Sequence, residues 1–277
     1  MTGPRSRGLR AIWSALPLAG PAGLLGLFLG LPVAVLVGRA LLDGSLATAL
    51  ATRVVVDALT LSLFTTAISL LLTVAFGLPL AIVLARGRAR IFTWLEALVD
   101  LPIVLPPSVA GLGLLLLLGR RGLLGGALDA VGLEIPFTTL AVILAQTFVA
   151  APFFVRSARL GIAGVDPTLE AAARIDGASE WRVFLHITLP LARSALAAGL
   201  VMSWARSLGE FGATIMFAGN VEGRTATLPL VVYGQFQAGD LDGSIAAAAI
   251  LVIAAFAVLI AVRTLHWGRA LDLRTLG

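Results

Sequence analysis

Long stretches without a charged residue constrain the fold of this chain more than any other feature of its sequence. A transmembrane helix needs about 20 mostly apolar residues. Uncharged stretches that approach or exceed that length lie between Arg10 and Arg39, Asp57 and Arg86, Asp100 and Arg120, Glu134 and Arg156, and Asp242 and Arg263. Another stretch, from about Ser194 to Phe217, contains only Arg206 and Glu210 as charged residues. We therefore predict an all-α, polytopic membrane bundle of six transmembrane helices.

The composition excludes most soluble functions. Of the 277 residues, 59% are hydrophobic and 13% are charged, whereas an average soluble domain has about 25% charged residues. So few charges cannot cover the surface of a soluble enzyme or a nucleic-acid-binding protein, and we expect lipid to cover the apolar surface. The first stretch is longer than the roughly 7–15 apolar residues of a signal peptide, which predicts an uncleaved first span.

Cysteine and histidine are too scarce for a metal centre. The chain has no cysteine, which excludes disulfides, thiolate-bound metals and cysteine nucleophiles. Its two histidines, His186 and His266, are too few for a multi-histidine site. We predict neither a metal nor a cofactor in this chain.

The arginines predict the orientation, because all 20 basic residues are arginines. Six spans place both termini on the same side of the membrane. Fourteen arginines fall on that side: Arg5, Arg7, Arg10, Arg86, Arg88, Arg90, Arg156, Arg159, Arg174, Arg182, Arg193, Arg263, Arg269 and Arg274. Five fall on the other side: Arg39, Arg53, Arg120, Arg121 and Arg224. Because cytoplasmic segments carry the excess of basic residues, we predict that both termini are cytoplasmic.

Residues 156–193 form the one long polar segment on the predicted cytoplasmic side. Asp166 is a good helix N-cap, and Gly177 is a typical helix stop. Ser179 can cap a second short helix, and Pro190 then marks entry into the fifth span. The pattern predicts two short helices joined at a glycine, which on spacing alone is compatible with an ordinary amphipathic loop.

Part of this segment carries a known signature. Residues 170–190 read EAAARIDGASEWRVFLHITLP. They resemble the cytoplasmic EAA signature of ABC-importer permeases: a Glu-Ala-Ala group, three residues, a glycine, nine residues, an isoleucine, one residue and a Leu-Pro pair. The matching residues are Glu170, Ala171, Ala172, Gly177, Ile187, Leu189 and Pro190.

The resemblance implies a mechanism. Residues 166–188 would form coupling helices, the first of which docks in a cleft of a cytoplasmic ABC ATPase subunit. When two ATPase subunits close on ATP, the spans would switch from inward-facing to outward-facing. This is the type I importer fold, and it implies a homodimer with the translocation path between the two copies.

Other segments narrow the group. They read LPIVLPP at 101–107, GRRG at 119–122, WARSLGEFGATIMFAGN at 204–220 and GRTATLP at 223–229. These segments resemble the molybdate, tungstate and sulfate permeases, and most of all the molybdate members. The resemblance implies import of an oxyanion, molybdate in the first place and tungstate or sulfate as alternatives, across the inner or plasma membrane of a prokaryote.

The same resemblance divides the chain and adds an outer partner. It covers residues 54–263, the expected transport domain. Residues 1–53 would hold a cytoplasmic tail, the first span and an outer loop, and residues 264–277 a cytoplasmic tail. An extracytoplasmic oxyanion-binding protein would dock on the outer loops 120–136 and 220–242. The arginines of these loops, Arg120, Arg121 and Arg224, either pair with that protein or are solvated.

Prolines in the third predicted span are the first candidates for the pathway or its gate. Pro102, Pro106 and Pro107, followed by Ser108, break helical hydrogen bonding there. Irregular backbone in a membrane must be covered by protein or water. The segment therefore either lines the pathway or forms a packed kink.

Charges in the fifth predicted span are the second candidates. Arg206 and Glu210 are four residues apart and would share one helix face. Charges within a span are costly and usually face the bundle interior. The pair belongs either to the pathway or to a structural ion pair, and the neighbouring Gly209 and Gly212 would let helices pack closely.

Two other function classes fit less well. An intramembrane enzyme needs a nucleophile and a base within the bilayer, and neither histidine lies in a predicted span. A secondary transporter would not need a coupling signature. The chain also has no lysine and therefore no phosphate-binding Gly-x4-Gly-Lys-Ser/Thr loop, so we predict that a partner, and not this chain, hydrolyses ATP.

Overall fold

A computed structural model describes the backbone of residues 5–87 and 89–272 and the side chains of residues 20–87 and 89–260. The described part consists of helices and connecting turns and contains no strand. The arginines at positions 5, 7, 10, 88, 263, 269 and 274, and His266, have side chains outside the described residues. The all-α membrane bundle that the sequence predicts is confirmed.

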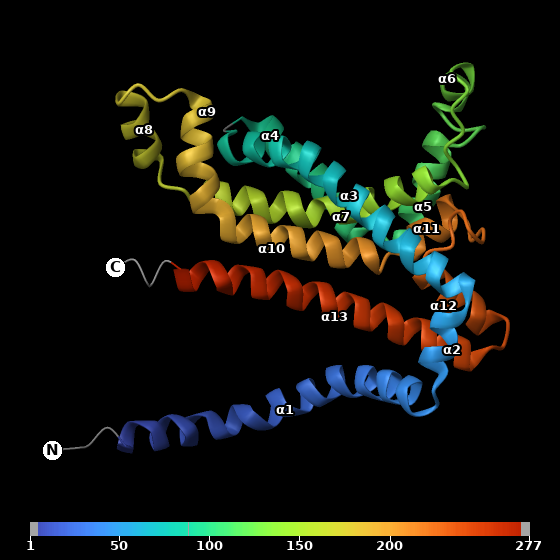
Figure 1. Ribbon diagram of the computed structural model, residues 1–277. Helices are drawn as coiled ribbons and strands as arrows, with labels where there is room; N and C mark the ends of the chain where they lie inside the picture. Colours follow the sequence, from blue (N-terminus) through green and yellow to red (C-terminus); the bar gives the residue numbers. More distant parts are fainter. Residues whose placement is uncertain (1–4, 88, 273–277) are drawn as a thin grey trace.

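Long apolar helices make up most of the molecule (Figure 1). They are α1 (Arg5–Leu42), α3 (Arg53–Arg86), α7 (Thr139–Ala163), α10 (Leu189–Leu208) and α13 (Leu241–Asp272). Each contains or belongs to a stretch that is long and apolar enough to cross a membrane. A bent pair, α4 (Arg90–Val104) and α5 (Pro107–Leu118), supplies the sixth crossing if the two helices count as one span.

Shorter helices cap the two ends of the bundle. They are α2 (Ser45–Ala51), α6 (Gly125–Ala130), α8 (Pro167–Ile175), α9 (Glu180–Val183), α11 (Gly212–Phe217) and α12 (Leu228–Gln237). In Figure 1, α8 and α9 lie at the end where α1 begins and α13 ends, and α2, α6 and α12 lie at the opposite end. This arrangement fits an even number of crossings.

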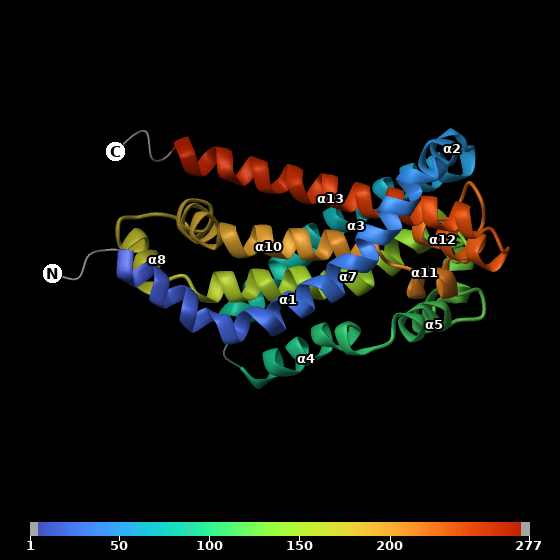
Figure 2. The ribbon, with the colours of Figure 1, turned by 90° about the horizontal axis from the view of Figure 1, so that it is seen from below.

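The centre of the bundle is the contact of α7 with α3 and α10 (Figure 2). Small residues let these helices approach closely. A Cβ atom on Gly77 of α3 would lie 3.0 Å from the Val155 side chain, and one on Gly199 of α10 would lie 2.9 Å from Cβ of Ser157. Such small residues are typical of packed membrane helices, where close van der Waals contact replaces the hydrophobic effect as the main attraction.

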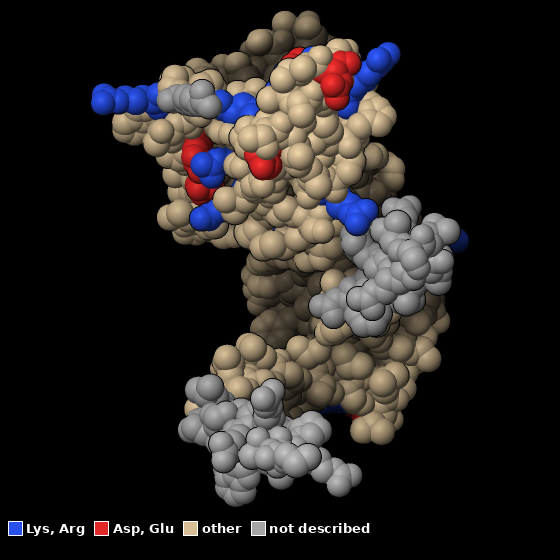
Figure 3. All heavy atoms as spheres, turned by 90° about the vertical axis from the view of Figure 1, so that its left-hand side faces the viewer, with Lys and Arg blue, Asp and Glu red and all other residues tan. Residues whose placement is uncertain are grey.

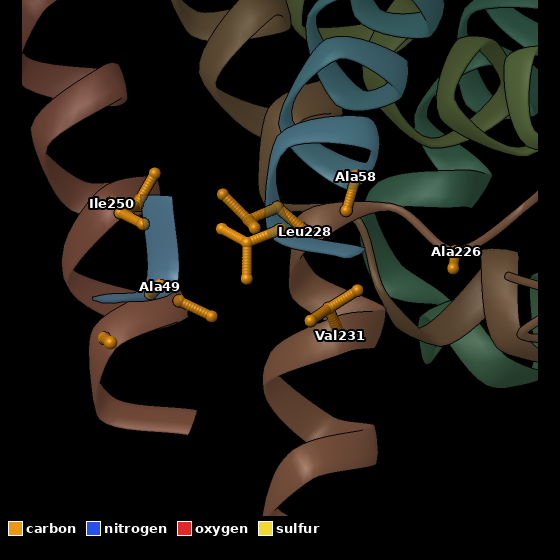
Figure 4. Packing of buried hydrophobic residues seen from close by; sticks show 9 residues of the cluster. Ala49, Ala58, Ala226, Leu228, Val231 and Ile250 are labelled. Carbon is orange, nitrogen blue, oxygen red and sulfur yellow. The ribbon is translucent and has the colours of Figure 1, made fainter. Parts of the chain in front are cut away.

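A second packed cluster joins α2, α3, α12 and α13 (Figure 4). Leu228 and Val231 of α12 point into it, towards Ala58 of α3 and Ile250 of α13. The predicted outer loop 220–242 is therefore wrong over this part, because α12 is folded into the bundle. Its apolar Leu-Pro-Leu-Val-Val run is long enough for a short buried helix but too short to register as a span.

In Figure 1, α1 diverges from α13 with distance from the α2 end, and its main contacts are with α13 and α2. From Gly20 onwards most of its side chains are exposed. An open, apolar groove of about 810 Å³ separates it from α13, with Leu29 and Val33 on one side and Ile253 and Phe256 on the other.

Two predicted spans are broken helices. The third, expected between Asp100 and Arg120, begins earlier, at Arg90, and bends by 116° between α4 and α5. The fifth, expected to run to Phe217, ends at Leu208, and a short non-helical link then leads into α11. Hydropathy alone does not reveal the first break, because the residues on both sides of it are apolar.

Candidate functional site

The two helix breaks meet in space. A Cβ atom on Gly111 of α5 would lie only 2.5 Å from the carbonyl oxygen of Ala213 in α11, and one on Gly212 would lie 2.9 Å from Cβ of Pro107. The two chain segments are thus in backbone contact. We call residues 104–111 and 208–213, where α5 and α11 begin, the break junction.

Proline chemistry explains the first break. Leu105, which precedes Pro106, and Pro106, which precedes Pro107, both have extended backbones, with ψ of 136° and 132°. A residue before proline is disfavoured in the helical region, so the helix cannot continue through this pair. Pro107 then starts α5, where its missing N–H costs nothing.

The prolines of the predicted pathway do not all lie together. Pro106, Pro107 and Ser108 are in the break junction, and the Ser108 side chain is exposed. Pro102 lies inside α4, before the break. It lines a separate cavity of about 250 Å³ between α3, α4 and α7, next to Thr147.

The charged residues flank the second break. Arg206 is in the last turn of α10, Gly209 follows the helix, and Glu210 lies in the link before α11. Oε2 of Glu210 lies 2.6 Å from Nη1 of Arg206, while its Oε1 accepts a hydrogen bond of 2.7 Å from the Ala213 amide. The two residues do not share a helix face as predicted, because the helix ends between them, but they do form an ion pair.

Burial separates the roles of these two side chains. The Glu210 side chain is fully buried, whereas 27% of the Arg206 side chain is exposed. Gly209 and Ser108 are exposed on the same junction. The Glu210 carboxylate thus holds the link to α11 in place, while part of the Arg206 side chain is exposed on a candidate membrane-spanning helix.

Hydroxyl side chains of α3, α7 and α10 are hydrogen-bonded to one another next to the break junction. The sequence analysis did not predict these contacts. Oγ of Ser69 in α3 lies 3.1 Å from Oγ of Ser207 in α10 and accepts a 3.1 Å hydrogen bond from Thr147 of α7. The signal was present in α3, where buried hydroxyl residues recur at helical spacing: Ser62, Thr65, Thr66, Ser69 and Thr73. Such hydrogen bonds contribute on average about 0.6 kcal/mol each in membrane helices.

The polar segment between α7 and α10 begins as predicted. The Asp166 carboxylate caps α8 by accepting a 2.9 Å hydrogen bond from the Thr168 amide. This bond lowers the pKa of Asp166 below its ordinary value. Gly177 ends the helix in the left-handed region, with φ of +85°, where glycine is favoured.

The second half of the segment differs from the prediction. Ser179 precedes α9 but makes no side-chain cap. The helix then continues from α9 through a π turn, η1 (Phe184–Thr188), directly into α10. The wider π turn relieves the clash that the ring of Pro190 would otherwise make with the carbonyl group four residues earlier, so this proline does not start a separate helix.

The residues that match the EAA signature lie on different surfaces. Ala171 and Ala172 are exposed on α8, and Pro190 is exposed at the start of α10. Ile187 and Leu189 are half-buried and pack against the apolar core of α3, α7 and α10. Four residues, 173–176, separate Ala172 from Gly177, one more than the family spacing, so the match of the Glu-Ala-Ala group is shifted by one position.

Glu170 points into the protein. Only 4% of this residue is exposed, and its carboxylate pairs with Arg86 at the end of α3 and accepts a 2.7 Å hydrogen bond from the Thr188 hydroxyl. On the outer side of the same segment, Arg174 pairs with Glu180 at 2.6 Å, which raises the pKa of Arg174.

Large apolar side chains are exposed on this segment, and the motif match did not single them out. Ile175 at the end of α8 is 86% exposed, and Trp181 on α9 is 66% exposed. They lie at the end of the bundle seen in Figure 3, where charged side chains are scattered over the surface. Exposed apolar groups among charges are typical of a protein-binding surface.

Known proteins resemble this chain over most of its length. The family model described as "Binding-protein-dependent transport system inner membrane component" matches residues 77–269. The "Molybdenum transport system permease protein ModB" of Mycobacterium tuberculosis is 45% identical over 205 residues, which cover 74% of this chain and 77% of the relative. A "Probable molybdenum ABC transporter permease protein" of Haloferax volcanii is 41% identical over 261 residues, 92% of this chain and 93% of the relative.

Solved structures agree on the fold. A chain of a bacterial ABC transporter that imports the acidic polysaccharide alginate superposes with a TM-score of 0.74 at 17% identity, over 95% of this chain and 98% of that one. With the family match over residues 77–269, it follows that this chain belongs to the family of binding-protein-dependent transport system inner membrane components.

Proposed function

We propose that this chain is the membrane-spanning subunit of an ATP-driven importer for molybdate. The observation that carries the proposal is the 45% identity to a protein named as a molybdenum transport permease, together with the importer fold. Tungstate and sulfate remain the alternative cargoes, because all three are tetrahedral dianions. The chain is a transport component and not an enzyme, as its family membership implies.

The exposed surface of α8 and α9 supports an ATPase partner. Ile175, Trp181 and the half-exposed Leu169 present apolar area at the end of the bundle over which charged side chains are scattered (Figure 3). Ala171 and Ala172 have small side chains on the exposed side of α8, so a partner can approach the helix backbone closely. In this proposal the contact to the ATPase uses these residues, while Glu170 serves inside the subunit.

The break junction supports a pathway shared by two copies. Arg206 lies in a candidate membrane span and is partly exposed, and a charge there must face protein or water rather than lipid. Ser108 and Gly209 add small, polar surface beside it. A homodimer with the break junction at its interface would place Arg206 against protein and a water-filled path instead of lipid. The residues at or next to that path would then be Pro106, Pro107, Ser108, Arg206, Gly209, Glu210 and Gly212.

The remaining assignments follow the same proposal. Both termini are cytoplasmic, and the transport domain spans residues 54–263. A binding protein docks at the end of the bundle that carries α2, α6 and α12 (Figure 1), in agreement with the family description. Arg120, Arg121 and Arg224 are all exposed, and Arg120 also pairs with Glu134 within its own loop, so Arg121 and Arg224 are our first candidates for contact with that protein.

Uptake by the reconstituted complex tests the cargo. The permease, its ATPase and its binding protein are placed in liposomes, and ATP-dependent uptake of molybdate is measured in competition with tungstate and sulfate. We expect molybdate uptake that stops when ATP is omitted. Preferential uptake of sulfate would overturn the cargo, and uptake without ATP or the ATPase would overturn the importer.

Cross-linking tests the dimer interface. The chain has no cysteine, so Ser108→Cys introduces a single reactive thiol at the break junction. We expect oxidation to link two copies through this position. Ile175→Cys, at the far end of the bundle, is the matched control and should remain monomeric on denaturing gels. Absence of the Ser108 link in membranes that contain active complex would contradict the interface.

A further inference from the structure

The attachment of α8 to the bundle is unusual for a helix. Of the nine residues of α8, only Glu170 is buried. A short helix is normally held in place by an apolar stripe, but here the buried group is a carboxylate. Among the residues of α8, Glu170 therefore makes the buried contact with the membrane-spanning helices.

The partners of Glu170 come from two different spans. The Glu170 carboxylate pairs with Arg86, in the last turn of α3, and accepts the hydrogen bond from Thr188, which directly precedes α10. Arg174 on α8 adds a weaker contact, with Nη2 at 3.7 Å from Oε2. The π turn Phe184–Thr188 contributes the Thr188 hydroxyl, which is itself buried.

The negative charge of Glu170 makes the loss of its partners energetically costly. A buried carboxylate is tolerated only when it is paired and hydrogen-bonded, and removal of a partner leaves an uncompensated charge. Of the groups around it, Arg86 is partly exposed, with 36% of its side chain accessible, whereas the Glu170 side chain is 5% accessible. If α8 leaves this position, Glu170 becomes exposed and loses its contacts with Arg86 and Thr188, whereas Arg174 lies on α8 and moves with it.

Both linked spans lead to the break junction. Helix α10 carries Arg206 in its last turn, and α3 is tied to α10 nearby through Ser69 and Ser207. We propose that Glu170 is a positioning residue that fixes α8 to α3 and α10, so that a displacement of α8 moves both spans as one body. This inference rests on the proposed function in one respect, namely that an ATPase moves α8 from its exposed side.

Conservative variants separate this role from simple folding. Glu170→Gln keeps the shape and removes the charge, Thr188→Val removes only the hydroxyl donor, and Arg86→Lys keeps the charge of the partner. The matched control is Glu180→Gln, which removes the exposed ion pair with Arg174 on the same segment and leaves the contacts of Glu170 with Arg86 and Thr188 in place.

Coupling efficiency is the functional readout. In proteoliposomes with the ATPase and binding protein, we expect Glu170→Gln to keep ATP hydrolysis. The amount of anion imported per ATP should fall by a factor of about five or more, because coupling between two sites typically changes a response by about 5- to 150-fold. Thr188→Val should show a smaller loss, and Arg86→Lys should retain most coupling. Glu180→Gln should match the parent. An unchanged ratio of anion to ATP in Glu170→Gln would overturn the proposal.

A distance measurement on the purified full chain provides a readout that needs neither cargo nor ATPase. Spin labels on cysteines introduced at Val83 of α3 and at Asp176, both exposed, report the distance between α8 and α3. We expect one narrow distribution in the parent and in Glu180→Gln, and a broader one in Glu170→Gln. An equally narrow distribution in Glu170→Gln would refute the link, whereas absence of molybdate uptake by the parent would refute only the proposed function.

Discussion

Glu210 and Arg206 form an ion pair across the end of a helix. Oε2 of Glu210 lies 2.6 Å from Nη1 of Arg206, although α10 ends at Leu208 between them. The pair is close without the geometry of a hydrogen bond, and the other carboxylate oxygen binds the first turn of α11. One buried side chain thus connects the end of α10, the link and the start of α11.

Removal of this carboxylate should destabilise the break junction. We expect Glu210→Gln to lower the free energy of unfolding by about 1–3 kcal/mol, less than the loss of a fully buried pair because Arg206 is partly exposed. Thermal unfolding of the purified protein in detergent measures this. A variant as stable as the parent would show that the link to α11 does not depend on the carboxylate.

A double variant distinguishes a structural pair from a pathway pair. Replacing both members of an ion pair leaves no unpaired charge, so Arg206→Met with Glu210→Gln, which keeps an acceptor for the Ala213 amide, should unfold closer to the parent temperature than Glu210→Gln alone. If Arg206 belongs to the pathway, as we propose, molybdate uptake by this stable variant should be lost. Uptake at the parent rate would assign the pair a purely structural role.

The contact between α5 and α11 has no space for a side chain. At Gly111 even a methyl group would clash with the Ala213 carbonyl, and overpacking of this kind costs about 1–3 kcal/mol. Gly113, two residues further along the same helix, has nothing within 4 Å, so Gly113→Ala should be neutral or stabilising. The unfolding temperatures of Gly111→Ala and Gly113→Ala test this directly, and equal values would contradict the close contact.

The cap of α8 predicts a local pH dependence. The hydrogen bond from Thr168 lowers the pKa of Asp166 in the folded protein, so its stabilisation is complete above the unfolded pKa of about 3.9 and is lost as the pH falls through the lower folded value. We expect the Thr168 amide to lose exchange protection below about pH 4. Asp166→Asn keeps the acceptor and cannot titrate, so its protection should not change over that range. The two proteins differ only at position 166, so the comparison isolates the Asp166 carboxyl group.

Local chemistry in this chain was predictable, and tertiary contacts were not. Asp166 and Gly177 act as predicted because a cap and a left-handed turn depend on neighbouring residues only. The prolines at 106 and 107 likewise announce a break, but nothing local shows that this break meets the second one at Gly212. The motif match included Glu170 among the residues that couple to the ATPase, whereas its burial depends on Arg86, which lies 84 residues away.

Ile175 provides the sharpest test of the exposed surface of α8. This side chain is 86% exposed at the end of a helix, so an acidic residue there can be solvated and should not affect folding. In a docking surface, however, Ile175→Glu would bury an unpaired charge against the partner, which is strongly unfavourable. We expect the variant to insert and unfold like the parent but to lose co-purification with the ATPase. Val131→Glu, at a position 74% exposed near α6, is the matched control and should retain the ATPase. Full retention of the ATPase by Ile175→Glu would mean that the partner contacts another part of the segment.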